Sequence, residues 1–278
     1  MRLDRTPESD AFAAWLLKVG AGRGLGGSNS IQLPPNMRLP DNSVNGLINA
    51  LYPGITQPDH PDDYFLHRTI LSPKNDAVDD MNQSILNRFP SEQTVLTSVD
   101  KVKSQMQDVY PIEFLHSLKA SGLPLAHLAL KPGCPIMLLR NLDVTSGLCN
   151  GTRMILLEIK QRVLKCRILG GKHAGNIVFI PWITIEPSQE DMPIPLSRRQ
   201  FPVRLAFSMT INKSQGQSVV NVGLDLRIPV FSHGQLYIAL SRCTSGDRIK
   251  VLFPSGSDNT ITQNIVYREL LTDILDPW

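Results

Sequence analysis

The sequence has no G-x-x-x-x-G-K-[ST] run, no closely spaced cysteine pair and no hydrophobic stretch of membrane-spanning length. Without the phosphate-cradling loop and its lysine, the chain has no evident primary site of its own for a nucleoside triphosphate. Cys134, Cys149, Cys166 and Cys243 are too far apart to predict a zinc knuckle, another metal site or a disulfide framework. Because no run approaches the ~20 apolar residues of a membrane span, and the first residues lack the apolar core of a signal peptide, we expect an intracellular protein with no membrane partner.

The charged residues are unevenly distributed, although the formal net charge is only +3. Residues 197–253 hold eight Lys or Arg against two acidic residues, and residues 131–190 hold eight against four, so the remainder of the chain is acidic. A basic C-terminal half predicts an anionic partner, and nucleic acid or a nucleotide is the obvious class. Scattered, solvated Lys and Arg side chains are the alternative explanation of the charge alone.

Hydrophobic patterning divides the 278 residues into four parts. Residues 1–64 predict an N-terminal helix and an irregular connection with one short helix, and residues 65–130 predict a strand, an amphipathic helix and a second short helix. Residues 131–195 predict short strands separated by turns, the pattern of a small β barrel. Residues 196–278 predict strands at 203–209, 219–224 and 248–253 and a helix from Ser232. Strands that alternate with helices indicate a parallel sheet, so the expected fold class is α/β with an inserted small barrel.

Gly22, Gly24 and Gly27 satisfy the spacing G-x-G-x-x-G of a dinucleotide-binding loop. That loop requires a strand before it and a helix after it, because the helix amides hold the pyrophosphate. Here a helical pattern precedes the glycines and Ser28-NSIQLPP follows them. The sequence therefore predicts a flexible loop at these positions.

Two runs near the C-terminal end interrupt apolar segments with polar residues. In Arg204-LAFSMTINKSQGQS an apolar strand is followed by Thr210, Asn212, Lys213, Ser214, Gln215 and Gly216. Ligands of open α/β sheets bind beyond the carboxyl ends of the strands, where such residues can converge on phosphate. In Ser232-HGQLYIALSR a short apolar helix ends at Arg242, whose planar donor fork can neutralise charge on a phosphoryl group.

Both runs resemble the fifth and sixth motifs of superfamily-one DNA helicases of the petite-integration-frequency (PIF) type. Their sequences, QFPVRLAFSMTINKSQGQS and VFSHGQLYIALSR, are most similar to the helicase portion of Helitron-type transposon proteins. Further similar segments are Met1-Arg2-Leu3, Ala13-AWLLKVGAG, Tyr110-PIEFLHSL and Leu138-LRNLDVTSGLCNGTR. The resemblance covers nearly the whole chain and implies the C-terminal half of such a helicase, a second RecA-like lobe that carries the inserted barrel.

The resemblance also implies an activity and its partners. Helicases of this type hydrolyse ATP, with Mg²⁺, between two RecA-like lobes and step 5′-to-3′ along single-stranded or forked DNA. This chain would need a first lobe in cis or in trans, and by family it would act in the nucleus or the mitochondrion. Because the family's Walker A and Walker B motifs precede the segment matched by Met1, we expect a truncated gene product or gene model.

The same resemblance assigns roles to single residues. Arg242 is implied to be an arginine finger that reaches ATP on the first lobe, and Arg2 a second contact to the γ-phosphate. Gln215, Gly216 and Gln235 are implied to couple the nucleotide state to the grip on DNA. The implied DNA contacts are Asn75, Thr210, Asn212, Lys213 and Ser214. The family usually has His in place of Asn212 and Arg in place of Trp182, and the second departure removes a basic contact or supplies a stacking platform.

Simpler roles are open for the same residues. Arg242 could form a surface ion pair at a helix end, and Lys213 could belong to an ordinary turn and cap. Arg2 could be a disordered terminal residue, Asn75 a helix N-cap, and His233 a capping or packing residue. For the whole chain, the alternatives to a motor half are a non-catalytic single-stranded DNA-binding module and a decayed transposon remnant.

Overall fold

The computed structural model describes residues 7–23, 29–102, 110–188, 192, 194–257, 260–267 and 269 of the chain. The described residues form two compact units. The first unit takes in the residues up to Ile55, residues 67–85 and the residues from Phe207 onward, and the second takes in residues 56–66 and 86–206. The second unit is therefore inserted into the first in the order of the chain.

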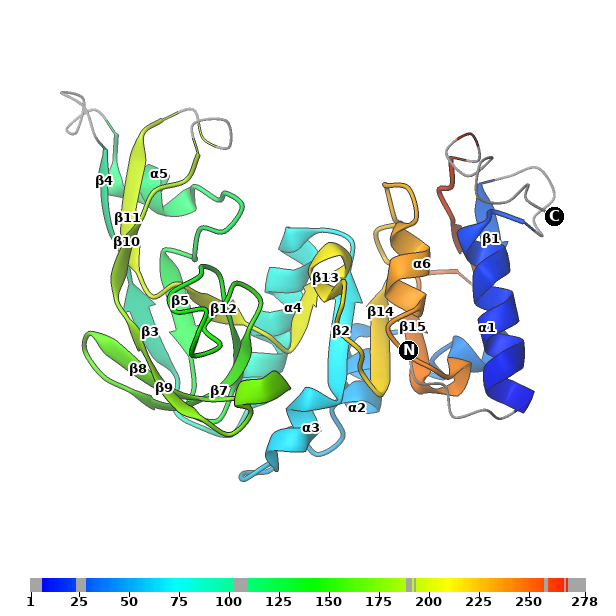
Figure 1. The fold of residues 1–278 in the computed structure, drawn as a ribbon. Helices are drawn as coiled ribbons and strands as arrows, with labels where there is room; N and C mark the ends of the chain where they lie inside the picture. The colour runs from blue at the N-terminus through cyan, green and yellow to red at the C-terminus, as the bar shows by residue number, and fades with distance from the viewer. Residues whose placement is uncertain are drawn as a thin grey trace. The chain divides into compact units, whose positions relative to one another are not determined.

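The first unit is built on a parallel sheet with the strand order β13-β2-β14-β15 (Figure 1). The strands of this unit are β1 (Ser30–Gln32), β2 (Arg68–Ser72), β13 (Ser208–Thr210), β14 (Asn221–Asp225), β15 (Ile249–Leu252) and β16 (Ile261–Gln263). The helices are α1 (Pro7–Gly20), α2 (Val44–Leu51), α4 (Asn75–Arg88) and α6 (Gln235–Leu240), with 3-10 turns η1 (Pro35–Met37), η3 (Ile211–Ser214) and η4 (Gly246–Arg248). β2 and β14 are buried along almost their whole length, as expected of parallel strands that are covered on both faces.

Glycine at position 223 allows α2 to pack closely on this sheet. A Cβ atom on Gly223 of β14 would lie 3.0 Å from Ile70 and 3.1 Å from both Leu47 and Leu51 of α2. Any larger residue would have to displace these buried side chains, and displacing core side chains is destabilising. Gly223 therefore sets the distance between helix and strand.

β13 is held in its register by side chains from α4 and from the end of α2. Asn82 of α4 accepts a hydrogen bond from the amide of Ser208 at 2.8 Å and donates one to the carbonyl of Ser208 at 3.0 Å. The hydroxyl of Tyr52 donates to the carbonyl of Phe207 at 2.6 Å. Thr210, the last residue of β13, pairs with Ser72, the last residue of β2. The segments that follow these two strands, η3 and the start of α4, consequently begin at one edge of the sheet.

The second unit consists of antiparallel sheets and two short helices. The strand orders are β12-β6-β7-β8-β9, β10-β11-β4 and β3-β5. The strands are β3 (Thr94–Thr97), β4 (Val99–Val102), β5 (His127–Leu130), β6 (Pro135–Leu138), β7 (Arg153–Ile159), β8 (Val163–Ile168), β9 (Ile177–Pro181), β10 (Ile183–Ile185), β11 (Leu196–Gln200) and β12 (Val203–Leu205). The helices are α3 (Asp62–Leu66) and α5 (Ile112–Ser117), with one 3-10 turn, η2 (Gly171–His173). Within the described residues no ladder joins the edge strands β9 and β12, so a closed small barrel stays a prediction.

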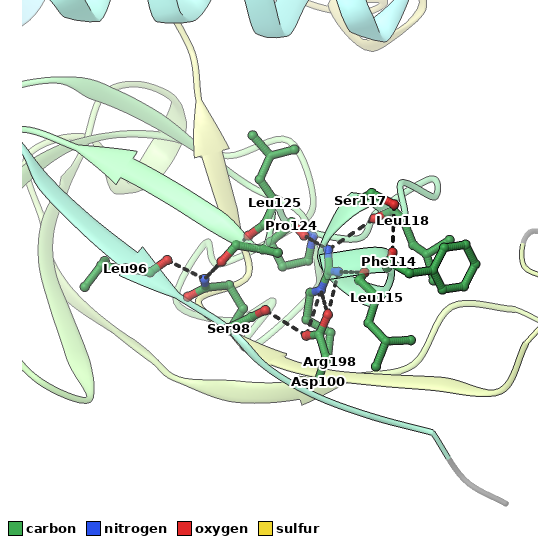
Figure 2. Close-up of polar contacts among 12 residues, drawn as sticks. Leu96, Ser98, Asp100, Phe114, Leu115, Ser117, Leu118, Pro124, Leu125 and Arg198 are labelled. Atoms are coloured by element: carbon green, nitrogen blue, oxygen red, sulfur yellow. Dashed lines mark hydrogen bonds and ion pairs between the residues drawn. The ribbon is translucent and has the colours of Figure 1, made fainter. Parts of the chain in front are cut away.

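One buried ion pair organises the β10-β11-β4 sheet and the helix beside it (Figure 2). Arg198 of β11 is 1% exposed and donates to the carboxylate of Asp100 on β4 through Nε, at 3.0 and 3.1 Å, and through Nη2, at 2.6 Å. The same guanidinium donates to the carbonyls of Leu115, Leu118 and Pro124 at 2.8, 3.3 and 3.0 Å. A single side chain thus fixes α5 and the segment that follows it against two strands.

A second polar side chain of β11 extends this network. Nε2 of Gln200 donates to the carbonyls of Leu96 at 2.9 Å and Ala126 at 3.2 Å, and its Oε1 accepts from the amide of Phe201 at 2.9 Å. Unpaired backbone carbonyls are costly when buried. Arg198 and Gln200 together therefore satisfy the irregular backbone between α5 and β5.

The second unit is larger than the insertion at 131–195 that the sequence predicts. Residues 86–130 and 196–206 also belong to it, because β3 pairs with β5 and β4 pairs with β11. The predicted strand at 203–209 is two strands in different sheets: β12 pairs antiparallel with β6, and β13 pairs parallel with β2. The chain passes from one unit to the other between Ala206 and Phe207.

Three of the basic residues that make the C-terminal half positive are buried. Arg198 is paired with Asp100, the Nη2 atom of Arg153 donates to the carbonyls of Phe65 and Ala206, and Nζ of Lys131 donates to the carbonyl of Phe89. These side chains stabilise the fold instead of offering charge to a partner. The positive surface is consequently smaller than the sequence count suggests.

Replacing Asp100 with alanine is expected to lower the free energy of unfolding by about 3–5 kcal/mol, because Arg198 would be left buried without its counter-charge. Lys160→Ala is the matched control, since Lys160 and Glu158 form an exposed pair at 3.5 Å and such pairs contribute about 0–1 kcal/mol. Urea unfolding followed by circular dichroism measures both changes. A loss below about 1 kcal/mol for Asp100→Ala would show that the pair does not organise the unit.

Candidate nucleotide and strand site

The polar run after β13 folds into a tight turn at the carboxyl edge of the parallel sheet. Ser214 is buried, and its hydroxyl donates to the carbonyl of Ile211 at 2.6 Å. The amide of Gln217 donates to the carbonyl of Ser214 at 3.0 Å. Gly216 has a φ of 81°, a conformation that glycine adopts without strain. The sequence folds here because short polar residues and a glycine satisfy a backbone that has left the sheet.

Arg242 binds this turn directly. Its Nη1 atom donates to the carbonyl of Ser214 at 3.3 Å and to that of Gln217 at 3.2 Å. Its Nε atom donates to the carbonyl of Ile238 at 2.9 Å, and its Nη2 atom to the hydroxyl of Ser241 at 2.9 Å. The arginine at the end of α6 and the turn of residues 214–217, which follows Lys213, therefore lie together.

The acceptors around Arg242 hold the guanidinium without cancelling its charge. All four are neutral groups, and within the described part of the chain no carboxylate lies close enough to form an ion pair with it. Burial lowers the pKa of Arg242 from its ordinary value, yet an arginine stays protonated in proteins. Arg227 differs, because its hydrogen bonds to Asp225 raise its pKa and pair its charge. Of these two arginines, Arg242 is the one whose charge is available to an anion.

Gln235 links α6 to the same turn. The helix begins at Gln235, after Gly234 with a φ of 67°, so it starts three residues later than the helix predicted from Ser232. Gln235 is 1% exposed; its Oε1 accepts from the amide of Phe231 at 3.0 Å, and its Nε2 lies 3.5 Å from Oδ1 of Asn212. A shift of α6 would consequently change the contact between Gln235 and Asn212.

The predicted site residues divide by accessibility. Asn212 and Gln215 are exposed and Lys213 is half-buried, whereas Thr210 and Ser214 are buried. Asn75 opens α4 and is exposed, and the register of β2 with β13 places the start of α4 beside the turn. Arg2, Gly24 and Gly27 lie outside the described residues.

Two residues outside this site also have definite contacts. The Cζ atom of Arg199 lies 4.7 Å from the ring centroid of Trp182, so an arginine is present beside the position where the family usually has one. Nδ1 of His233 accepts from the amide of Tyr267 at 2.9 Å, and the two rings stack at 5.4 Å. His233 therefore has a packing role, in agreement with the simpler interpretation.

Sequence reasoning missed the groups that position Arg242. The hydroxyl of Ser241 and the carbonyl of Gln217 accept from the Arg242 guanidinium. The carbonyl of Arg242 accepts from the amide of Val219 at 3.1 Å. Backbone carbonyls leave no signal in a sequence, and a serine beside an arginine is too common to single out. Among the described residues no group of three His, Cys, Asp or Glu side chains could hold a metal ion, and no helix is both long and apolar enough to cross a bilayer.

Comparison with known proteins shows which helicases the chain resembles. Residues 113–159 match the family described as DNA helicase Pif1, 2B domain. The ATP-dependent DNA helicase PIF1 of Danio rerio is 31% identical over 188 residues, which are 66% of this chain and 27% of that protein. The human protein of the same name is 38% identical over 128 residues, which are 45% of this chain and 19% of that protein. The chain is a relative of the Pif1 helicases.

A solved structure shares the fold of this Pif1-like chain. The crystal structure of Bacteroides Pif1 bound to ssDNA matches with a TM-score of 0.60 and 22% identity, over 97% of this chain and 53% of that one. The match gives the chain a RecA-like α/β helicase fold with mixed sheets. The Pif1-like chain spans about half the length of that structure and about a quarter or less of the two curated relatives.

Replacing Arg242 with alanine is expected to loosen the turn that follows β13, because the carbonyls of Ser214 and Gln217 would lose their donor. Hydrogen bonds from a charged group contribute about 1.5–3 kcal/mol each, so amide hydrogen exchange at residues 214–217 should become at least about tenfold faster. Arg248→Ala, which removes an exposed arginine of the same unit, should leave these rates unchanged. Equal exchange rates in the Arg242→Ala variant and the unmodified chain would contradict the contact.

Proposed function

We propose that this Pif1-like chain forms the C-terminal motor half of an ATP-dependent 5′-to-3′ DNA helicase of the Helitron type. In this proposal the first unit is the second RecA-like lobe, and the antiparallel second unit is its small-barrel insertion. ATP and Mg²⁺ bind on a first lobe, supplied in cis or in trans, that carries the phosphate-binding loop. Single-stranded or forked DNA is the partner, so the site of action is the nucleus or the mitochondrion.

The observation that carries the proposal is the unneutralised guanidinium of Arg242, bound to the turn of residues 214–217. Charge grows on the γ-phosphoryl group during transfer, and a positioned arginine stabilises it. Arg242 is suited to this role as an arginine finger because its planar fork is held in place by neutral acceptors. Arg2 is proposed as the second contact to the same phosphate.

The contacts of Arg242 also suggest how hydrolysis is coupled to movement. The carbonyls of Ser214 and Gln217 accept from Nη1, so a phosphate that takes the Nη1 hydrogens would release the turn. A released turn carries Lys213 and Asn212 with it, and Gln235 transmits the shift of α6 to Asn212. We assign Gln215 and Gly216 to this coupling, and Asn75, Thr210, Asn212, Lys213 and Ser214 to the grip on the strand. Buried Thr210 and Ser214 take part once the turn opens.

Arg242→Lys is expected to reduce ATP turnover by about a thousandfold or more, because an arginine finger contributes a factor of about 10³–10⁵ to kcat. The assay joins the full chain to the first RecA-like lobe of a Pif1 relative and measures phosphate release with single-stranded DNA present. Arg248→Lys is the matched control and should retain the rate. The chain without a first lobe should show negligible turnover.

Two results would contradict the motor half. One is strong ATP hydrolysis by the purified chain alone, since the proposed finger would then have no separate lobe to act on. The other is a joined protein in which Arg242→Lys keeps the unmodified rate.

A second candidate function, single-strand binding without hydrolysis, is supported by the Arg199–Trp182 contact of the second unit. An aromatic ring beside a cation is the arrangement on which unstacked bases bind. Binding of oligo(dT) by the chain alone, steeply weakened by salt, together with no hydrolysis after a first lobe is joined, would favour this function. The joined protein would hydrolyse ATP if the motor interpretation is right.

A further inference from the structure

A polar hollow of about 400 Å³ lies in the second unit, in the loop between β6 and β7 and beside the segment after α5. Its lining residues are Ser121, Gly122, Leu139, Arg140, Asn141, Asn150 and Ser188. Among the lining residues that the structure describes, only Leu139 has an apolar side chain and none is acidic. A hollow with one cation, several polar donors and no carboxylate suits a small oxyanion.

Arg140 is held in this hollow with its charge unpaired. It follows β6 and is half-buried, its Nε atom is buried, and that atom has no hydrogen-bond partner in the described part of the chain. Within the described residues the side chain forms no ion pair either. Buried donors are nearly always satisfied in folded proteins, and a charged donor most of all. Arg140 is therefore suited to bind an anionic ligand.

Gly122 and the loop before β7 fix the rest of the hollow. A Cβ atom on Gly122, which has a φ of +68°, would lie 3.7 Å from the Cζ and Nη2 atoms of Arg140, so the guanidinium lies against the bare glycine backbone. Oδ1 of Asn141 accepts from the amide of Asn150 at 2.7 Å. The Nδ2 group of Asn141 is a donor and is not used in that bond.

The acidic residue of this loop does not compete for Arg140. The carboxylate of Asp143 accepts hydrogen bonds from the amides and hydroxyls of Thr145 and Ser146 at 2.6–3.3 Å. These bonds lower the pKa of Asp143 to about 2. The one carboxylate within the loop is thus committed to the loop's own turn.

We propose that this hollow binds a backbone phosphate of nucleic acid, with Arg140 as the charged partner and Asn141 and Asn150 as neutral donors. A phosphate offers oxygens to the planar fork of arginine and to amide donors together. That the phosphate belongs to nucleic acid rests on the proposed function, whereas the binding of a phosphate group by this hollow does not. The site uses none of the residues assigned to nucleotide or strand in the first unit.

The test follows the Nε–Hε resonance of Arg140 in the full chain by nitrogen-edited NMR, with the signal assigned from Arg140→Gln. Inorganic phosphate and a short oligo(dT) are each expected to shift it to saturation, and sodium chloride of equal ionic strength is not. Arg140→Gln should weaken oligo(dT) binding about tenfold and reduce the salt slope of binding by about one. Arg162→Gln is the matched control, since it removes an exposed arginine of the same unit, and it should change affinity by less than about twofold.

Three outcomes would overturn the proposal. An Arg140 resonance unmoved by both probes would show that the hollow binds no phosphate. Equal losses of affinity in Arg140→Gln and Arg162→Gln would show diffuse charge attraction instead of a site. Saturation by inorganic phosphate without a response to oligo(dT) would exclude nucleic acid as its source. Each of these readings is independent of ATP hydrolysis, so a failure here leaves the motor proposal standing.

Discussion

The guanidinium of Arg242 is the constraint on which the candidate site depends. It joins the last turn of α6 to the turn after β13 through four neutral acceptors. Because none of these acceptors carries a negative charge, the contacts position the side chain without neutralising its positive charge. In the proposed function, the Nη1 atom that now donates to the turn of residues 214–217 would leave it to bind a phosphoryl group.

The parallel sheet makes this meeting possible. β13 and β2 end at paired residues, Thr210 and Ser72, so the segments that follow them start from one edge. Asn82 and Tyr52 hold β13 from α4 and from the end of α2. Residues 86–206 belong to the antiparallel second unit, which has its own buried ion pair between Arg198 and Asp100. Each unit is thus organised by a buried polar contact that local sequence does not reveal.

Local signals in the sequence predicted the elements well where a single stretch of residues decides them. Short strands within residues 131–195 and an amphipathic helix within residues 65–130 form as the apolar patterns indicate, at Arg153–Ile159, Val163–Ile168 and Asn75–Arg88. The sequence could not reveal that residues 203–209 divide between two sheets, because the partners, β6 and β2, are more than 60 residues away. It also could not reveal that Arg198 is buried, since Asp100 lies 98 residues earlier. These features depend on pairing between distant residues, which the pattern of a single sequence does not predict.

A structure of the chain joined to a first RecA-like lobe, with a non-hydrolysable ATP analogue and Mg²⁺ bound, tests the central claim most directly. The account predicts that Arg242 leaves the carbonyls of Ser214 and Gln217 and binds the γ-phosphate at about 2.7–2.9 Å. It also predicts that the turn of residues 214–217 changes conformation in the same structure. A bound analogue with Arg242 still donating to both carbonyls, and no other contact to the phosphate, would contradict it.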